Sequence, residues 1–111
     1  MAAAKKEVIN VVGQDLEDPS QEKAYYEWYH ERHLPEMFKF KGMKRAARYK
    51  RIGDDKTVPT YLTIYTFPSM EEFEKYNTSP ERAAGGKVPG RPSSVKGTMR
   101  AQYELIRAWE K

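Results

Sequence analysis

Four stretches of the chain carry hydrophobic patterns that predict β-strands. Residues 6–12 form a short run rich in β-branched side chains, and residues 60–67 (TYLTIYTF) are rich in aromatic and β-branched ones. Residues 43–52 alternate small or apolar side chains with basic ones, which predicts a strand with one face towards solvent. Residues 98–108 fit either a strand or a helix by pattern alone.

An unbroken helical pattern from residue 20 to residue 38 predicts the first helix. Asp18 or Ser20 can cap its start with a side-chain oxygen. Pro35 removes a backbone donor, so we expect the helix to kink or end near Leu34.

Ser69 and Glu72 have the spacing of a capping box, which predicts a second helix over residues 70–78. Residues 13–20 are polar and are predicted to form a loop. Residues 80–97 are rich in Gly, Pro and Ser, so we expect a long loop with at most one helical turn at PERAAG. Loops of this length are lids, binding loops or mobile connections.

These elements occur in the order strand, helix, strand, strand, helix, so a closing strand over residues 98–108 completes a βαββαβ unit. The sequence therefore predicts an α+β, ferredoxin-like sandwich in which two helices cover one face of a four-stranded antiparallel sheet. At 111 residues the chain fits a single domain spanning 1–111. The uncovered sheet face is expected to pair with a second copy, which gives a homodimer.

The composition is that of a soluble globular protein, with 39% hydrophobic and 32% charged residues and 8 Tyr, 4 Phe and 2 Trp. The sequence contains no cysteine, which excludes disulfides and thiolate metal sites. The N-terminal residues lack an apolar stretch long enough for a signal peptide or a membrane span. We therefore expect a cytoplasmic protein without a membrane partner.

A run of Lys and Arg without any acid extends from residue 39 to residue 51. Such a strip could contact phosphates, but no nucleic-acid-binding motif accompanies it. An anionic small molecule would suit the charge equally well, and we expect no nucleic-acid partner.

Residues 25–37 (YYEWYHERHLPEM) bring both histidines of the chain together with four aromatic residues. Tyr29 and His33 are i, i+4 neighbours on one side of the predicted helix, with Tyr25 on the same side and Tyr26 and Met37 flanking it. A neutral histidine in an aromatic cavity can take a proton from an acidic carbon, and tyrosine hydroxyls can stabilise the resulting enolate.

The same pattern also fits a purely structural role, with the aromatic residues in the core and His33 near the end of the helix. His30 lies further round the helix and is interpreted as solvated surface. His30 and His33 are spaced as a potential metal pair, but the chain offers no further His or Cys cluster to complete a site. We therefore expect no metal.

Candidates also lie on the predicted strands. Asn10 is a polar residue inside the first strand, where a buried side chain would need a partner or a ligand. Tyr65 is a further candidate on the third strand. On the second strand Arg45 and Tyr49 share one face while Arg48 lies on the other, and whichever arginine faces the pocket could hold a carboxylate or a phenolate.

Three segments, WYHERHLPEM, GMKRAARY and PTYLTIYTF, resemble the EthD-like family of the dimeric α+β barrel superfamily. Members often carry an aromatic pair followed by His-Leu-Pro, then a glycine and a strand with Arg and Tyr. The resemblance covers residues 8–84. It implies a ferredoxin-like subunit that pairs through its sheet and holds a pocket between the sheet and its helices.

Similar proteins include cofactor-independent lactone isomerases and polyketide-processing decarboxylases, in which the helix histidine is the usual candidate for proton transfer. The resemblance therefore implies that His33 is catalytic, with Trp28 and Tyr29 as the aromatic pair before it, and that no cofactor is needed. The i, i+4 position of Tyr29 beside His33 adds it as the second catalytic candidate. The other candidates are assigned to substrate binding: Asn10, Tyr25, Tyr26, Trp28, Met37, Arg45, Tyr49 and Tyr65.

Three functions remain open at this point. The first is a cofactor-independent isomerase, decarboxylase or lyase acting by proton transfer on an apolar or aromatic carbonyl or acid compound. The second is a non-catalytic binding or accessory protein that uses the same cavity. The third is a cofactor-free monooxygenase, because related folds include monooxygenases that use an Asn, Trp and His set comparable to Asn10, Trp28 and His33.

Overall fold

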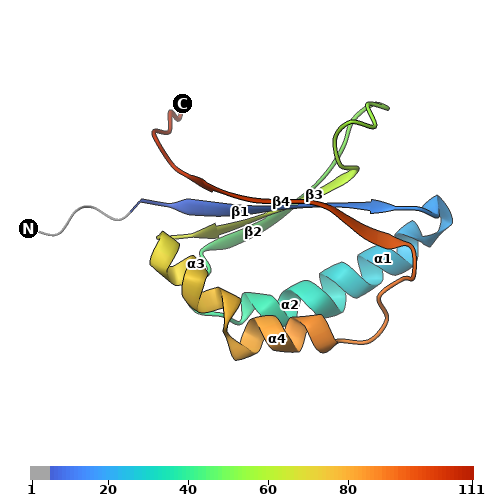
Figure 1. The fold of residues 1–111 in the computed structure, drawn as a ribbon, viewed down its shortest axis with the longest axis horizontal. Coiled ribbons are helices and arrows are strands. Elements are labelled where there is room, and N and C mark those ends of the chain that lie inside the picture. Colours follow the sequence, from blue (N-terminus) through green and yellow to red (C-terminus); the bar gives the residue numbers. More distant parts are fainter. Residues whose placement is uncertain (1–5) are drawn as a thin grey trace, which may run out of the picture.

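The structure, a computed structural model, describes residues 6–111. Its four strands are β1 (Val8–Leu16), β2 (Arg45–Lys50), β3 (Tyr61–Phe67) and β4 (Val95–Glu104). They form one antiparallel sheet in the order β2-β3-β1-β4. All helices lie on the same face of this sheet (Figure 1). The predicted ferredoxin-like α+β fold is confirmed.

The first helix continues past Pro35 to Phe38, contrary to the expected end near Leu34. It consists of α1 (Glu22–Trp28), a π-helical turn (Tyr29–His33) and α2 (Leu34–Phe38). In the π turn the Leu34 amide bonds to the Tyr29 carbonyl, five residues back instead of four. Pro35 is the second residue of α2, which directly follows the π turn.

The expected long loop over residues 80–97 is also wrong, because α4 (Pro80–Lys87) occupies its first half. Ser79 caps this helix by accepting a hydrogen bond from the Arg82 amide at 3.1 Å. Gly85 is present because α4 packs closely on α2: a Cβ there would overlap Met37 Cγ. One of the glycines that predicted a loop, Gly85, thus permits close helix contact.

The second predicted helix is present as α3 (Met70–Asn77), and Ser69 accepts from the Glu72 amide as the capping box predicts. β1 is longer than expected and extends to Leu16 through residues predicted to be a loop. A β-bulge opposite β4 lies between Gly13 and Gln14.

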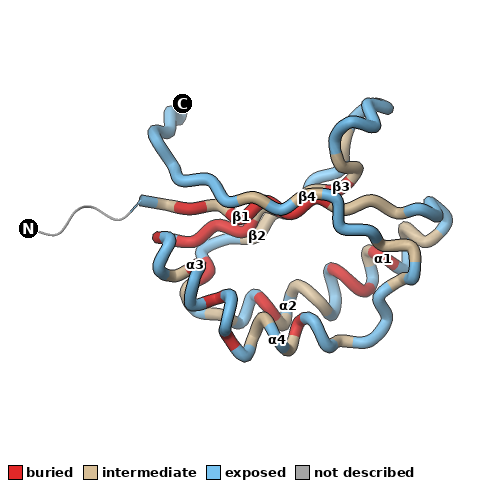
Figure 2. The backbone as a smooth tube through the Cα atoms, viewed as in Figure 1, coloured by how far each residue is buried: buried red, intermediate tan, exposed pale blue. Residues whose placement is uncertain are grey.

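The core lies between the sheet and the helices, where Figure 2 shows most of the buried residues. One cluster gathers around Tyr65, Phe67 and Tyr76, and a second consists of Tyr25, Trp28, Tyr29 and Tyr61. Within residues 6–111, no helix is long and apolar enough to cross a membrane.

The opposite face of the sheet is left uncovered by the helices, and we call it the open face. Strand register places Ile9 and Val11 of β1 beside Ile64 of β3 and Ala101 of β4 on this face. The β2–β3 connection and the C-terminal segment both project on the same side (Figure 1).

Candidate functional site

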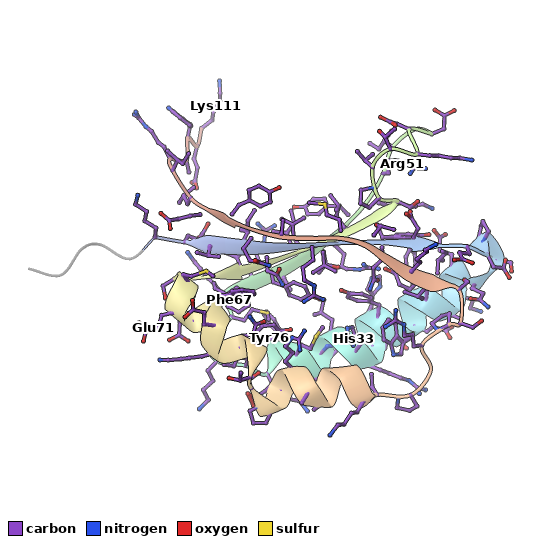
Figure 3. The ribbon with its side chains drawn as sticks, in the orientation of Figure 1. His33, Arg51, Phe67, Glu71, Tyr76 and Lys111 are labelled. Carbon is purple, nitrogen blue, oxygen red and sulfur yellow. The ribbon has the colours of Figure 1, made fainter. Side chains whose placement is uncertain are left out.

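A pocket of about 240 Å³ lies between the sheet and the helices. Five of the residues proposed from the sequence line it: Asn10, Tyr29, His33, Met37 and Tyr65. Tyr76 of α3 joins them, and Figure 3 shows His33 and Tyr76 extending from their helices into the layer below the sheet.

His33 ends the π turn, and its ring is held on three sides. Nδ1 lies 2.6 Å from the Gly85 carbonyl oxygen of α4. The ring stacks on Trp28 at a centroid distance of 4.4 Å and meets the edge of Tyr29 at 5.0 Å. Because a carbonyl can only accept, Nδ1 carries the proton and donates to Gly85, which leaves the lone pair of the neutral ring on Nε2.

Burial lowers the pKa of His33 below its ordinary value of 6.5, and the charge of Arg91 lowers it further, while the bond to Gly85 acts in the opposite direction. The imidazole is therefore neutral at pH 7. Nε2 has no hydrogen-bond partner within residues 6–111, and it is not a buried unpaired atom, so solvent in the pocket reaches it. This nitrogen is an accessible base.

A chain of hydrogen bonds runs beneath the pocket from β2 to β3. Arg48 Nη1 donates to Thr63 Oγ1 at 3.0 Å, and Thr63 Oγ1 donates to the Tyr29 hydroxyl at 2.8 Å. The Tyr29 and Tyr65 hydroxyl oxygens are 2.6 Å apart.

The direction of this chain follows from the arginine, which can only donate. Thr63 therefore accepts from Arg48 and donates its own hydroxyl to Tyr29. Either of the Tyr29 and Tyr65 hydroxyls can be the donor to the other, and when Tyr29 donates, the Tyr65 proton is available to the pocket. Burial raises the pKa of Tyr65 well above 10, so this group is a neutral donor over the whole physiological range.

Asn10 supplies a second donor from the floor of the pocket. Its side chain is buried, and its Oδ1 accepts a bond from Gln102 Nε2 of β4 at 2.9 Å. The Nδ2 group is therefore the part of Asn10 that is available to a ligand. Tyr76 donates to Met37 Sδ at 3.1 Å, and burial raises the pKa of this tyrosine to about 12.

Three of the aromatic residues proposed as ligand contacts lie outside the pocket lining. Tyr25 is fully buried behind it and donates to Gln14 Oε1 at 2.7 Å. Trp28 supports the His33 ring, and its buried Nε1 has no hydrogen-bond partner. Tyr26 stacks on His30 and meets the Tyr61 ring edge-on, next to β2 and outside the pocket.

Arg45 and Tyr49 do not line the pocket either. Register pairs Arg45 with Thr66 and Tyr49 with Leu62, and these residues share the open face. Arg48 is the β2 arginine that faces the helices, with its guanidinium 3.7 Å from the Tyr29 ring centroid. Alternation along the strand had separated the two arginines, but it could not say which face the helices would cover.

Sequence reasoning missed several lining residues. They come from β1, from α4 and the connection after it, and from β4, and they are Val12, Arg82, Gly86, Arg91 and Arg100. Gln14, whose place at the end of the predicted first strand is typical of binding residues, also lines the pocket. The alternation that places Asn10 inward also predicts Val12 and Gln14 on the same face. No comparable signal exists for Arg82 and Arg91, because their segment was predicted to be a loop.

A larger and more open groove of about 540 Å³ lies at the far end of the sheet, away from His33. Its lining is charged and internally paired, since Lys50 Nζ lies 2.7 Å from Glu22 Oε2 and Tyr61 donates to the same carboxylate. Among residues 6–111, no group of three His, Cys, Asp or Glu side chains is arranged to hold a metal ion.

Comparison with known proteins gives a family and a fold. The family model described as "Domain of unknown function (DUF4286)" matches residues 16–88. No curated protein matches the chain in sequence.

Three solved structures are similar over nearly the whole chain. A hydroxynitrile lyase from Passiflora edulis has 14% identity and a TM-score of 0.68, covering 97% of this chain and 100% of that one. SnoaB, a cofactor-independent oxygenase from Streptomyces nogalater, has 8% identity and a TM-score of 0.67, covering 96% and 99%. An ethyl tert-butyl ether D (EthD) family protein from Bacillus halodurans C-125 has 16% identity and a TM-score of 0.66, covering 91% and 99%.

Other similar structures are described as dimeric proteins with a ferredoxin-like fold. At these identities the likeness establishes the fold alone. It confirms, at that level, the resemblance to the EthD-like dimeric α+β barrel proteins.

Proposed function

Because the chain belongs to the DUF4286 family, a family of unknown function, we propose a function from the pocket itself: a small enzyme that moves a proton on a carbonyl compound without a cofactor. The observation that carries this proposal is the bond from His33 Nδ1 to the Gly85 carbonyl, which fixes the tautomer with an accessible lone pair on Nε2.

In the proposed reaction His33 Nε2 takes a proton from the carbon next to the substrate carbonyl. The electron pair of the broken C–H bond forms a C=C bond, and the carbonyl oxygen takes the negative charge. Tyr65, with Asn10 beside it, donates a hydrogen bond to that oxygen. The imidazolium then returns the proton to another carbon, which is an isomerisation, or to a leaving group, which is a lyase reaction.

Tyr29 acts in this scheme through Tyr65: the two hydroxyls are hydrogen-bonded, and the scheme takes Tyr29 as the donor, which directs the Tyr65 proton at the pocket. It is therefore a positioning residue in this proposal, where sequence reasoning had made it catalytic. Two of the similar structures are named as a hydroxynitrile lyase and a cofactor-independent oxygenase, so the fold supports enzymes of both kinds.

We also propose that the protein works as a homodimer joined through the open face. The aliphatic side chains on that face support this proposal, as do the similar proteins described as dimeric. Burying these apolar side chains between two copies would stabilise the dimer relative to leaving them exposed to water.

The function is tested by solvent exchange, which is measured on the substrate itself whatever product is formed. A panel of ketones, lactones and aromatic carbonyl acids is incubated with the protein in D₂O, and loss of the C–H signal next to the carbonyl is followed by NMR. With a compound that the protein turns over, His33→Asn should slow exchange by roughly 100-fold or more, the range expected for a general base.

His30→Gln is the matched control, because it replaces the other imidazole of the helix. Gln keeps an oxygen that can accept the bond from Arg48 Nε, just as Asn keeps a nitrogen that can donate to Gly85. The control should exchange at the wild-type rate. A folded His33→Asn protein with wild-type exchange would contradict the proposal.

A further inference from the structure

The pocket around His33 is lined by three arginines and by no acidic residue. Arg82 comes from α4, Arg91 from the connection between α4 and β4, and Arg100 from β4, so segments distant in sequence place their charges around one cavity. Arg100 is opposite Val12 in the sheet and therefore shares the face of Asn10.

The cavity continues into a shallower groove of about 450 Å³ along β4. Val12, Gln14, Arg91 and Arg100 line both spaces, and the groove also contains no acidic side chain. A bound molecule would thus meet positive charge at the mouth of the pocket and along the way out of it.

These arginines are not neutralised within the described part of the chain. The ion pairs between residues 6 and 111 all use lysine as the cation. Arg91 donates a long bond from Nη2 to the Val95 carbonyl, at 3.5 Å, and its guanidinium carbon lies 5.7 Å from the centre of the Trp28 ring.

The charges act on the groups that line the pocket. Arg91 favours the neutral form of His33. Burial raises the pKa of Tyr76, and the charges of Arg82 and Arg100 act in the opposite direction. Three like charges around one small cavity repel one another, and an anion placed among them relieves that repulsion while accepting charge-assisted hydrogen bonds. Arginine is suited to this role because its guanidinium presents paired donors to carboxylate or phosphate oxygens.

We propose that the pocket takes an anionic organic molecule, a carboxylate or a phosphate ester, whose charged group is held by Arg82, Arg91 and Arg100. The apolar part of the molecule lies against Met37 and Tyr76, within reach of His33. This inference rests on the proposed function in that it names the substrate class of the same pocket. It moves the anion-binding role from β2, where the sequence suggested it, to α4 and β4.

Binding is tested with three probes of the same shape: 1-naphthoate, 1-naphthyl phosphate and the neutral 1-naphthamide. Calorimetric titration of wild-type protein should show both anions binding at least about tenfold more tightly than the amide, since a charged acceptor forms stronger hydrogen bonds with arginine than a neutral one does. Added salt should weaken the binding of both anions and leave the binding of the amide unchanged. The stronger of the two anions identifies whether the site prefers carboxylate or phosphate.

Arg91→Gln and Arg100→Gln should each raise the dissociation constants of the two anions by about tenfold and leave that of the amide unchanged. Lys23→Gln, at an exposed position of α1, removes the same charge outside the pocket and should change nothing. Equal affinity for naphthoate and naphthamide, no measurable binding of either anion, or wild-type binding in the Arg91→Gln/Arg100→Gln double variant would overturn the proposal.

His33→Asn separates this inference from the proposed function. If the variant and the wild type bind naphthoate equally but neither exchanges any carbonyl compound, the anion site stands and the enzyme proposal fails. If exchange depends on His33 with neutral substrates and the arginine variants retain it, the enzyme proposal stands and the anion site fails.

Discussion

The two faces of the sheet are built from the same four strands and differ in their side chains. The face beneath the helices carries the apolar core, Phe67 included, and among it the buried polar side chains of Asn10 and Thr63. The open face carries the aliphatic side chains of Ile9 and Ile64 among polar ones. Folding alone requires neither polar groups under the helices nor aliphatic groups in water. Both features agree with the proposed pocket on one face and the proposed dimer interface on the other.

Hydrogen bonding explains how the covered face tolerates its polar groups. Thr63 lies between Arg48 and Tyr29, and Asn10 Oδ1 accepts from Gln102, so both of these buried polar side chains are hydrogen-bonded. The aliphatic side chains of the open face form no hydrogen bonds, and they gain free energy by leaving water.

The largest effect should come from placing a charge at the centre of the open face. Ile64→Asp would bury an unpaired carboxylate in the proposed dimer interface, so the dimer dissociation constant should rise by at least about 30-fold, the effect of losing a hot spot of about 2 kcal/mol. Light scattering over a range of concentrations measures this change.

Ala24→Asp introduces the same charge at an exposed position of α1 and should leave the assembly intact. A wild-type protein with the mass of one chain at micromolar concentration would refute the proposed division between the two faces.

Two neighbouring glycines of α4 test how closely the helices cover the pocket face. A Cβ at Gly85 would overlap Met37 Cγ and lie 3.2 Å from the His33 carbonyl oxygen, whereas a Cβ at Gly86 would meet nothing within 4 Å. Gly85→Ala should therefore lower the free energy of unfolding by about 1–3 kcal/mol through overpacking.

Gly86→Ala should instead raise the free energy of unfolding by up to about 1 kcal/mol, because alanine restricts the unfolded chain and favours the helix. Urea unfolding at one fixed protein concentration compares the two variants. Equal effects of the two substitutions would mean that α4 does not pack on α2 as closely as described.

Removing the Tyr29 hydroxyl tests the hydrogen-bond chain of the covered face. Tyr29→Phe leaves the Thr63 and Tyr65 hydroxyls without their shared partner, so we expect a loss of about 1–2 kcal/mol of unfolding free energy. Tyr76→Phe removes only a bond to the Met37 sulfur and should cost less than about 1 kcal/mol. The reverse order in urea unfolding would show that the chain contributes little.

Local patterns predicted much of this architecture from the sequence. The aromatic and β-branched run of β3, the Ser69 cap of α3 and the i, i+4 pair of Tyr29 and His33 each depend on residues close together in the chain. The order of elements then sufficed to choose the strand over the helix for β4, and the structure confirms that choice.

The parts that were missed depend on contacts between distant segments. Gly85 suggested a loop by composition, and its role is visible only once Met37 lies against it. The pocket arginines, Arg91 and Arg100 among them, converge through the fold and not through any motif. Alternation separated Arg45 from Arg48, but the face that each would occupy was decided by where the helices packed.

The smallest expected effect is the pH dependence contributed by His33. Its pKa in the folded protein is lowered from 6.5 by burial, with Arg91 and Arg48 acting in the same direction against the bond to Gly85. Between 6.5 and the lowered folded value the unfolded chain binds more protons, so the stability contributed by the neutral ring is complete above pH 6.5 and falls as the pH decreases through that window. Below the folded pKa there is no further loss.

Urea midpoints measured from about pH 7 to about pH 5 isolate the histidines, because ordinary carboxyl groups titrate near 4. His30 has a lowered pKa as well, so His33→Asn and His30→Gln should each remove part of the slope, and the double variant should be nearly flat in this range. His33 should contribute more of the pH dependence than His30, because its imidazole is the more buried of the two. A slope that survives intact in the double variant would assign the pH dependence to other groups and leave the buried environment of His33 without support.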